Sequence, residues 1–157
     1  MFRFKLLPAQ ADNVYRGSKL ALPMFVFFLS VMTWRSLIHM FFERYGLHEI
    51  ANFIILTGEP DPNPVVYRFF SLWGFQQLIF CFISWVIVWK YRSLMALVCG
   101  LWIVEWGVRV FYYPNFKNNL NLAIYTSETP PGIEWASYVF CSLIVIFLLM
   151  IKTNDHN

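Results

Sequence analysis

The sequence SLMALVCGLWIVEWGVRVFYY, residues 93–113, decides the fold class of this chain. A membrane-spanning helix needs about 20 predominantly apolar residues, and this stretch has that length. It nevertheless contains two ionisable residues, Glu105 and Arg109. Because a charge in hydrocarbon is costly, the stretch predicts a membrane helix whose charged face contacts protein or water.

The composition of the whole chain favours a membrane protein. Of its 157 residues, 59% are hydrophobic and 13% are charged, whereas soluble domains carry about 25% charged residues. Three further apolar segments reach spanning length. We therefore predict an all-α membrane protein, a four-transmembrane-helix bundle that forms one polytopic domain over residues 1–157, with spans at about 20–42, 65–89, 93–113 and 133–151.

The distribution of basic residues predicts the orientation of the bundle. Seven basic residues would lie on one side: Arg3, Lys5, Arg16, Lys19, Lys90, Arg92 and Lys152. The loops on the other side carry Arg44 and Lys117, with Arg68 as a third if it lies outside its span. The positive-inside rule then puts both termini in the cytoplasm. We predict a multi-pass protein of the cell inner membrane, with the lipid bilayer and not nucleic acid as its partner.

Polar residues within the predicted spans gather in the outer half of the membrane. Arg35 and His39 are four residues apart, as are Glu105 and Arg109, so each pair shares a helix face. We predict interhelical pairs of Arg35 with Glu105 and of Arg109 with Glu134. The full set of candidate ligand-binding residues is Arg35, His39, Arg68, Gln76 (or its neighbour Gln77), Glu105, Arg109 and Glu134.

Two interpretations of this polar set stay open. It forms either interhelical hydrogen bonds that hold the bundle together or a pocket for an anionic small molecule or lipid head group. The three cysteines, Cys81, Cys99 and Cys141, form no C-x-x-C pair, which argues against a thiol–disulfide oxidoreductase. The sequence has no nucleotide-binding or zinc-binding spacing and no histidine pair placed as haem ligands, so we predict no cofactor and no metal.

Small residues on the second predicted span indicate where helices approach closely. Ser71, Gly74, Cys81 and Ser84 form a seam of small side chains on that span. Membrane helices pack through such seams because small side chains let two backbones approach each other. Gly74 is therefore predicted to lie in a helix–helix contact.

Several short motifs mark the predicted spans and the loops between them. They are Arg68-Phe69 followed by Gly74, the basic turn Lys90-Tyr91-Arg92, Gly107-Val108-Arg109, and Pro130-Pro131-Gly132 before Glu134. In this layout the chain resembles small bacterial membrane proteins of the DUF4345 and DoxX-like families. The resemblance implies a four-helix bundle and little about chemistry. The function favoured at this stage is a non-enzymatic membrane protein whose polar cluster binds a ligand or partner. The alternatives are a membrane-embedded enzyme or transporter for a lipid-like substrate, and an accessory subunit of a larger membrane complex. The partners considered besides the bilayer are a lipid or small anionic ligand, another membrane protein and further copies of the chain in a homo-oligomer.

Overall fold

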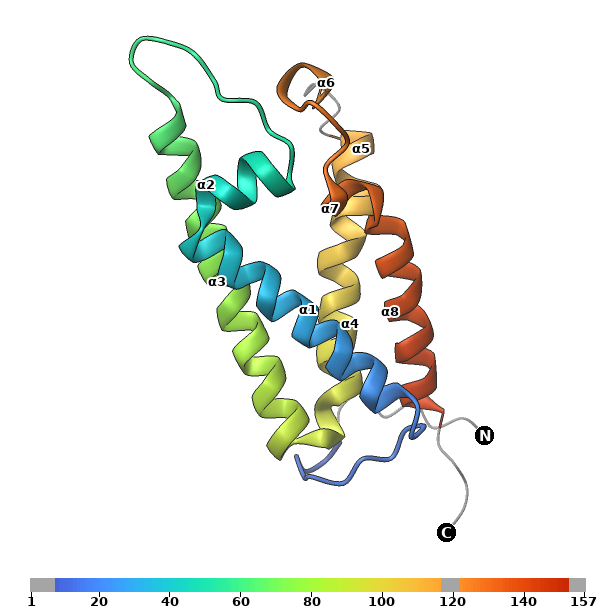
Figure 1. Cartoon of the computed structure of the whole chain (residues 1–157). Helices are drawn as coiled ribbons and strands as arrows, with labels where there is room; N and C mark the ends of the chain where they lie inside the picture. The colour runs from blue at the N-terminus through green and yellow to red at the C-terminus, as the bar shows by residue number, and fades with distance from the viewer. Residues whose placement is uncertain (1–7, 117–121, 153–157) are drawn as a thin grey trace.

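The structure is a computed structural model that describes residues 8–116 and 122–152. Helices make up its regular secondary structure, and the described residues contain no strand, only one isolated backbone bridge (Figure 1). The predicted all-α class is therefore confirmed. α1 (Ala21–Phe41) packs along α3 (Asn63–Lys90), while α4 (Met95–Gly107) packs along α8 (Ala136–Ile151).

Within the described residues, three helical segments are long and apolar enough to cross a membrane. They are Ala21–Phe41, Asn63–Lys90 and Arg92–Tyr112, close to the first three predicted spans. The third comprises the 3₁₀ turn η2 (Arg92–Leu94), then α4, then the π-helical turn η3 (Val108–Tyr112), which α5 (Tyr113–Phe116) continues. Pro64 lies in the first turn of α3, where its missing N–H leaves no helical bond unmade.

The fourth predicted span is interrupted. α8 has 16 residues, so it is about 24 Å long, which is less than the roughly 30 Å of a hydrocarbon core. A short helix, α7 (Pro131–Glu134), precedes it, and Trp135 separates the two. The apolar run alone did not reveal this break.

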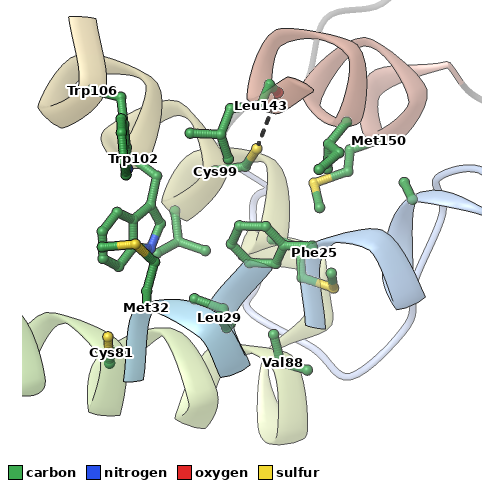
Figure 2. Close-up of a cluster of buried hydrophobic side chains, with 14 of the residues drawn as sticks. Phe25, Leu29, Met32, Cys81, Val88, Cys99, Trp102, Trp106, Leu143 and Met150 are labelled. Carbon is green, nitrogen blue, oxygen red and sulfur yellow. Dashed lines mark hydrogen bonds between the residues drawn. The ribbon is translucent and has the colours of Figure 1, made fainter. Parts of the chain in front are cut away.

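One hydrophobic core joins the four longer helices (Figure 2). Phe25 and Leu29 of α1, Trp102 of α4 and Leu143 of α8 are each fully buried. The indole N–H of Trp102 donates to the hydroxyl of Ser84 on α3 over 3.1 Å. The buried indole thus has a polar partner, and tryptophan at this position belongs to the core, whereas Trp34, Trp89 and Trp135 are exposed.

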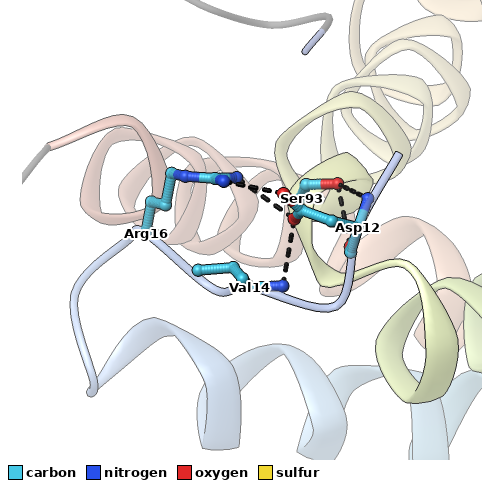
Figure 3. Close-up of polar contacts among 4 residues, drawn as sticks. All are labelled: Asp12, Val14, Arg16 and Ser93. Atoms are coloured by element: carbon cyan, nitrogen blue, oxygen red, sulfur yellow. Dashed lines mark hydrogen bonds and ion pairs between the residues drawn. The ribbon is translucent and has the colours of Figure 1, made fainter. Parts of the chain in front are cut away.

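The segment before α1 forms hydrogen bonds with other helices at one end of the molecule (Figure 3). The hydroxyl of Ser93 donates to the carbonyl of Asp12 over 2.9 Å and accepts the Asp12 amide over 2.9 Å. Arg16 donates to both carboxylate oxygens of Asp12 and thereby lowers the pKa of that carboxyl. The Ser18 amide donates to the carbonyl of Leu149 over 2.9 Å, so the end of α8 joins the same assembly.

We call this the basic end, because five basic residues lie in the segments that meet here. They are Arg16, Lys19, Lys90, Arg92 and Lys152. Tyr15 packs against the core here, and burial raises the pKa of its hydroxyl to about 12. The segments that carry these basic residues therefore meet at one end of the helices.

At the opposite end, the loop end, the two long loops pair with each other. Phe53 and Thr126 form the isolated antiparallel bridge. The Ile54 amide donates to the carbonyl of Tyr125 over 3.0 Å, and the Ser127 amide donates to that of Asn52 over 2.9 Å. Asn52 makes this approach with a φ of 57°, a left-handed conformation that asparagine tolerates better than most residues. The first loop begins with α2 (Glu43–Tyr45) and η1 (Gly46–Ile50); the second contains α6 (Leu122–Tyr125) and continues to α7.

Candidate functional site

Glu105 and Arg109 form an ion pair at the junction of α4 and η3. The guanidinium of Arg109 donates to Oε1 of Glu105, and the two side chains are 17% and 26% exposed. Arg109 lies inside the π-helical turn η3. Such turns are rare and often occur at functional sites, because the extra residue in the turn changes the direction of nearby side chains.

Gln77 connects this pair to α1. Its Nε2 donates to Glu105 Oε1 over 3.2 Å, and its Oε1 accepts from Arg35 Nη1 over 3.1 Å. The hydroxyl of Ser36 donates to the same Gln77 oxygen over 3.3 Å. Gln77 is buried, so this amide is a polar bridge between α1, α3 and α4 within the packed helices.

Trp73 brings both guanidiniums to one aromatic ring. The Cζ atom of Arg35 lies 4.9 Å from the indole centroid of Trp73, and that of Arg109 lies 5.1 Å from it. The His39 ring contacts the same indole, with centroids 4.8 Å apart. Arginine over tryptophan is a favourable cation–π arrangement, and it is strongest where water is excluded.

We call these six residues the cationic cluster: Arg35, His39, Trp73, Gln77, Glu105 and Arg109. Two guanidiniums in the cluster face one carboxylate. Several of its buried polar atoms have no hydrogen-bond partner among the described residues: Nδ1 of His39, Oε2 of Glu105 and Nε of Arg109. Buried polar groups are normally satisfied, so atoms of this kind indicate a place for water or a ligand.

The structure corrects two of the predicted pairings. Arg109 pairs with Glu105 and not with Glu134, whose side chain is exposed on α7. Arg35 reaches Glu105 through Gln77 instead of directly. The sequence predicted that these residues lie at a similar level along their helices but not how the helices are rotated, and rotation decides which side chains meet.

Gln76 and Arg68 also lie outside the cationic cluster. Gln76 is exposed, and Gln77 takes the predicted position, because neighbouring residues on a helix point about 100° apart. Arg68 is exposed near the start of α3 and lines a separate groove. The sequence interpretation missed Trp73 as a site residue, although Trp73 and Gln77 are one helical turn apart and share a face.

No protein-family model, no curated protein and no solved structure matches the chain. The resemblance to the DUF4345 and DoxX-like families therefore stays a prediction. Function resides in a site and not in a fold, so the geometry and charge of the cationic cluster are what indicate the function of this chain.

Proposed function

We propose that the chain is a four-span integral membrane protein that binds an anionic small molecule or lipid head group at the cationic cluster. The observation that carries this proposal is the convergence of Arg35 and Arg109 on the Trp73 ring, with Glu105 as the one carboxylate hydrogen-bonded within the cluster. Two cations close together in a low-dielectric site repel each other. A bound anion would offset the uncompensated positive charge.

Hydrogen-bonding capacity supports the same proposal. A guanidinium has five N–H donors. Within the described residues, Arg35 donates one hydrogen bond, to Gln77, and Arg109 donates one, to Glu105. Planar arginine forks bind phosphate and carboxylate oxygens in pairs, so the remaining donors suit a ligand with several anionic oxygens.

The packing of the helices supports membrane insertion. Large apolar side chains point away from the core, including Phe27 at 71%, Phe82 at 69% and Tyr138 at 66% exposure. Exposed apolar surface of this extent indicates contact with lipid or protein. α7, Trp135 and α8 together cover 21 residues, from Pro131 to Ile151, or about 31 Å, which is enough for a fourth span.

We expect inorganic phosphate to raise the thermal unfolding midpoint of the detergent-purified chain, measured at constant ionic strength against chloride. A ligand at about 100 times its Kd adds roughly 2.7 kcal/mol of stability. Arg35→Gln and Arg109→Gln should remove this increase, because each deletes donors to the anion. Glu105→Gln should enlarge it, because the carboxylate repels the anion.

Lys90→Gln is the matched control, since Lys90 is exposed at the basic end, far along α3 from the cluster. It should respond to phosphate as the unaltered chain does. If phosphate shifts no midpoint, or shifts all four variants equally, the cluster is not an anion site and serves to hold the helices together.

We also expect tags at both termini to report the cytoplasm and a tag inserted at Gly58, in the loop before α3, to report the outside. The basic end carries the cytoplasmic charge signal, since basic residues near span ends stay on the cytoplasmic side. Phosphatase and fluorescent-protein fusions measure this directly. A terminus found outside in the unaltered chain would overturn the proposed orientation.

A further inference from the structure

A second charged site lies on the outside of α2 and α3. An open groove of about 540 Å³ is lined by both charged and apolar side chains, among them Glu43, Arg44, Tyr67, Arg68, Leu72 and Phe75. This volume lies within the range of roughly 300–1,000 Å³ that small ligands occupy. No residue of the cationic cluster lines this groove.

The groove and the cationic cluster use different faces of α3. Arg68, Leu72 and Phe75 are spaced by four and three residues and so share one face. Trp73 and Gln77 of the cluster share another face. At about 100° per residue, the centres of the two faces are more than 150° apart. A ligand in the groove would therefore be a different molecule from an anion in the cluster.

The charges around the groove are not paired with one another. Across residues 8–116 and 122–152, the ion pairs within 4.0 Å are those of Arg16 with Asp12 and of Arg109 with Glu105. Arg44 instead stacks on Tyr67, with its Cζ 5.2 Å from the ring centroid. Two guanidiniums and one carboxylate, Glu43, thus face one groove with their charges available to a ligand.

The position of the groove along α3 corresponds to the boundary between head groups and acyl chains. α3 has 28 residues, or about 42 Å, so a centred helix extends roughly 6 Å beyond each side of a 30 Å hydrocarbon core. Arg68 is the sixth residue of α3, about 8 Å along the axis, and therefore lies near that boundary. Leu72 and Phe75, which are 58% and 44% exposed, lie deeper, at the level of acyl chains.

We propose that this groove seats one phospholipid whose head group carries both a phosphate and a primary ammonium, as phosphatidylethanolamine does. The arginines Arg44 and Arg68 bind the phosphate, Glu43 accepts hydrogen bonds from the ammonium, and Leu72 and Phe75 contact an acyl chain. Glu43 decides the head group, because its carboxylate can accept hydrogen bonds from a primary ammonium, which a purely anionic head group does not have. This inference rests on the membrane insertion proposed above and not on anion binding by the cationic cluster.

The test is a lipid competition measured by native mass spectrometry of the full chain in detergent. Phosphatidylethanolamine, phosphatidylcholine and phosphatidylglycerol with identical acyl chains are added separately. We expect phosphatidylethanolamine to bind about tenfold more tightly than phosphatidylcholine, whose trimethylated nitrogen cannot donate to Glu43. It should also bind more tightly than phosphatidylglycerol, which has no ammonium group.

Two variants locate the lipid. Glu43→Gln should abolish the preference for phosphatidylethanolamine over phosphatidylcholine, and Arg68→Gln should weaken the binding of both lipids about tenfold. Two control variants should leave both the lipid preference and the affinities unchanged. They are Glu49→Gln, which changes an exposed carboxylate of the same loop, and Lys90→Gln. Lack of a phosphatidylethanolamine preference in the unaltered chain, or unchanged binding in Glu43→Gln and Arg68→Gln, would overturn the inference.

Arg35→Gln separates this inference from the proposed function. It should leave the phosphatidylethanolamine preference intact while it removes the response to phosphate. If Arg35→Gln abolishes lipid binding and Arg68→Gln does not, the lipid occupies the cationic cluster and the groove proposal is wrong. Release of the chain from membranes by alkaline carbonate would instead contradict the membrane insertion on which both proposals depend.

Discussion

Replacing Glu105 with glutamine should lower the thermal unfolding midpoint by about 5–10 °C in detergent. Glutamine keeps the shape and most hydrogen bonds of the side chain but removes the charge that Arg109 contacts. Breaking a buried ion pair from one side costs about 3–5 kcal/mol in soluble proteins, and membrane polar pairs often cost less. A loss of about 2–3 kcal/mol corresponds to this shift for a chain of this size.

A second substitution that restores stability to the Glu105→Gln variant will identify the charged partner of Glu105. Because Arg109 touches Glu105 directly, Arg109→Gln combined with Glu105→Gln should recover most of the loss. Arg35→Gln should recover less, since Arg35 acts through the amide of Gln77. A double-mutant cycle over the two pairs, measured in the same detergent, gives the two coupling energies.

Two outcomes would contradict the observed arrangement. Stronger rescue by Arg35→Gln would mean that Arg35, as the sequence suggested, is the direct partner. A Glu105→Gln variant as stable as the unaltered chain would mean that Arg109 needs no charged partner. In that second case its stacking on Trp73 and Trp106, at 5.1 and 5.0 Å, would be enough to hold the guanidinium in place.

The positions of the three long helical segments were predictable, because a segment that crosses a bilayer needs an apolar run of about 20 residues and has to be helical over that run. The prediction for residues 65–89 differs from α3 by a few residues at its N-terminal end, where Pro64 fits the first turn. The break at Trp135 was not predictable from hydropathy. The predicted span of 133–151 ran across this point because Ile133, Trp135 and Ala136 are apolar, and the single charge of Glu134 did not mark the end of α7.

The level of the site residues along the helices was predictable, but their side-chain contacts were not. The spacing of Glu105 and Arg109 identified a pair on one face, since residues four apart lie one helical turn from each other. The choice between Gln76 and Gln77 depends on a rotation of about 100° about the α3 axis. That rotation is set by the packing of α3 on α1, and neither the polarity nor the position of a single residue encodes it.

Replacing Gly74 with alanine should destabilise the chain more than a glycine-to-alanine replacement at any other glycine described in the long helices. A Cβ at this position would lie 2.6 Å from the Met40 amide nitrogen and 2.8 Å from the His39 carbonyl carbon. These are backbone atoms of α1, which cannot move aside as a flexible side chain can. Overpacking costs about 1–3 kcal/mol, and we expect the upper part of that range or more.

Gly100→Ala is the matched control, because it adds the same atom in α4, another long helix. There the new Cβ would have its nearest contact at 3.7 Å, with the ring of Phe147. Alanine also favours helix over glycine by up to about 1 kcal/mol, so this variant should be as stable as the unaltered chain or more stable. Because Gly74 also sets the distance between α1 and α3, Gly74→Ala should separate Arg35 from Gln77 and weaken the phosphate response. Equal unfolding midpoints for the two variants would show that α1 and α3 do not approach each other closely at Gly74. The hydrogen bond between Arg35 and Gln77, which needs this close approach, would then be contradicted as well.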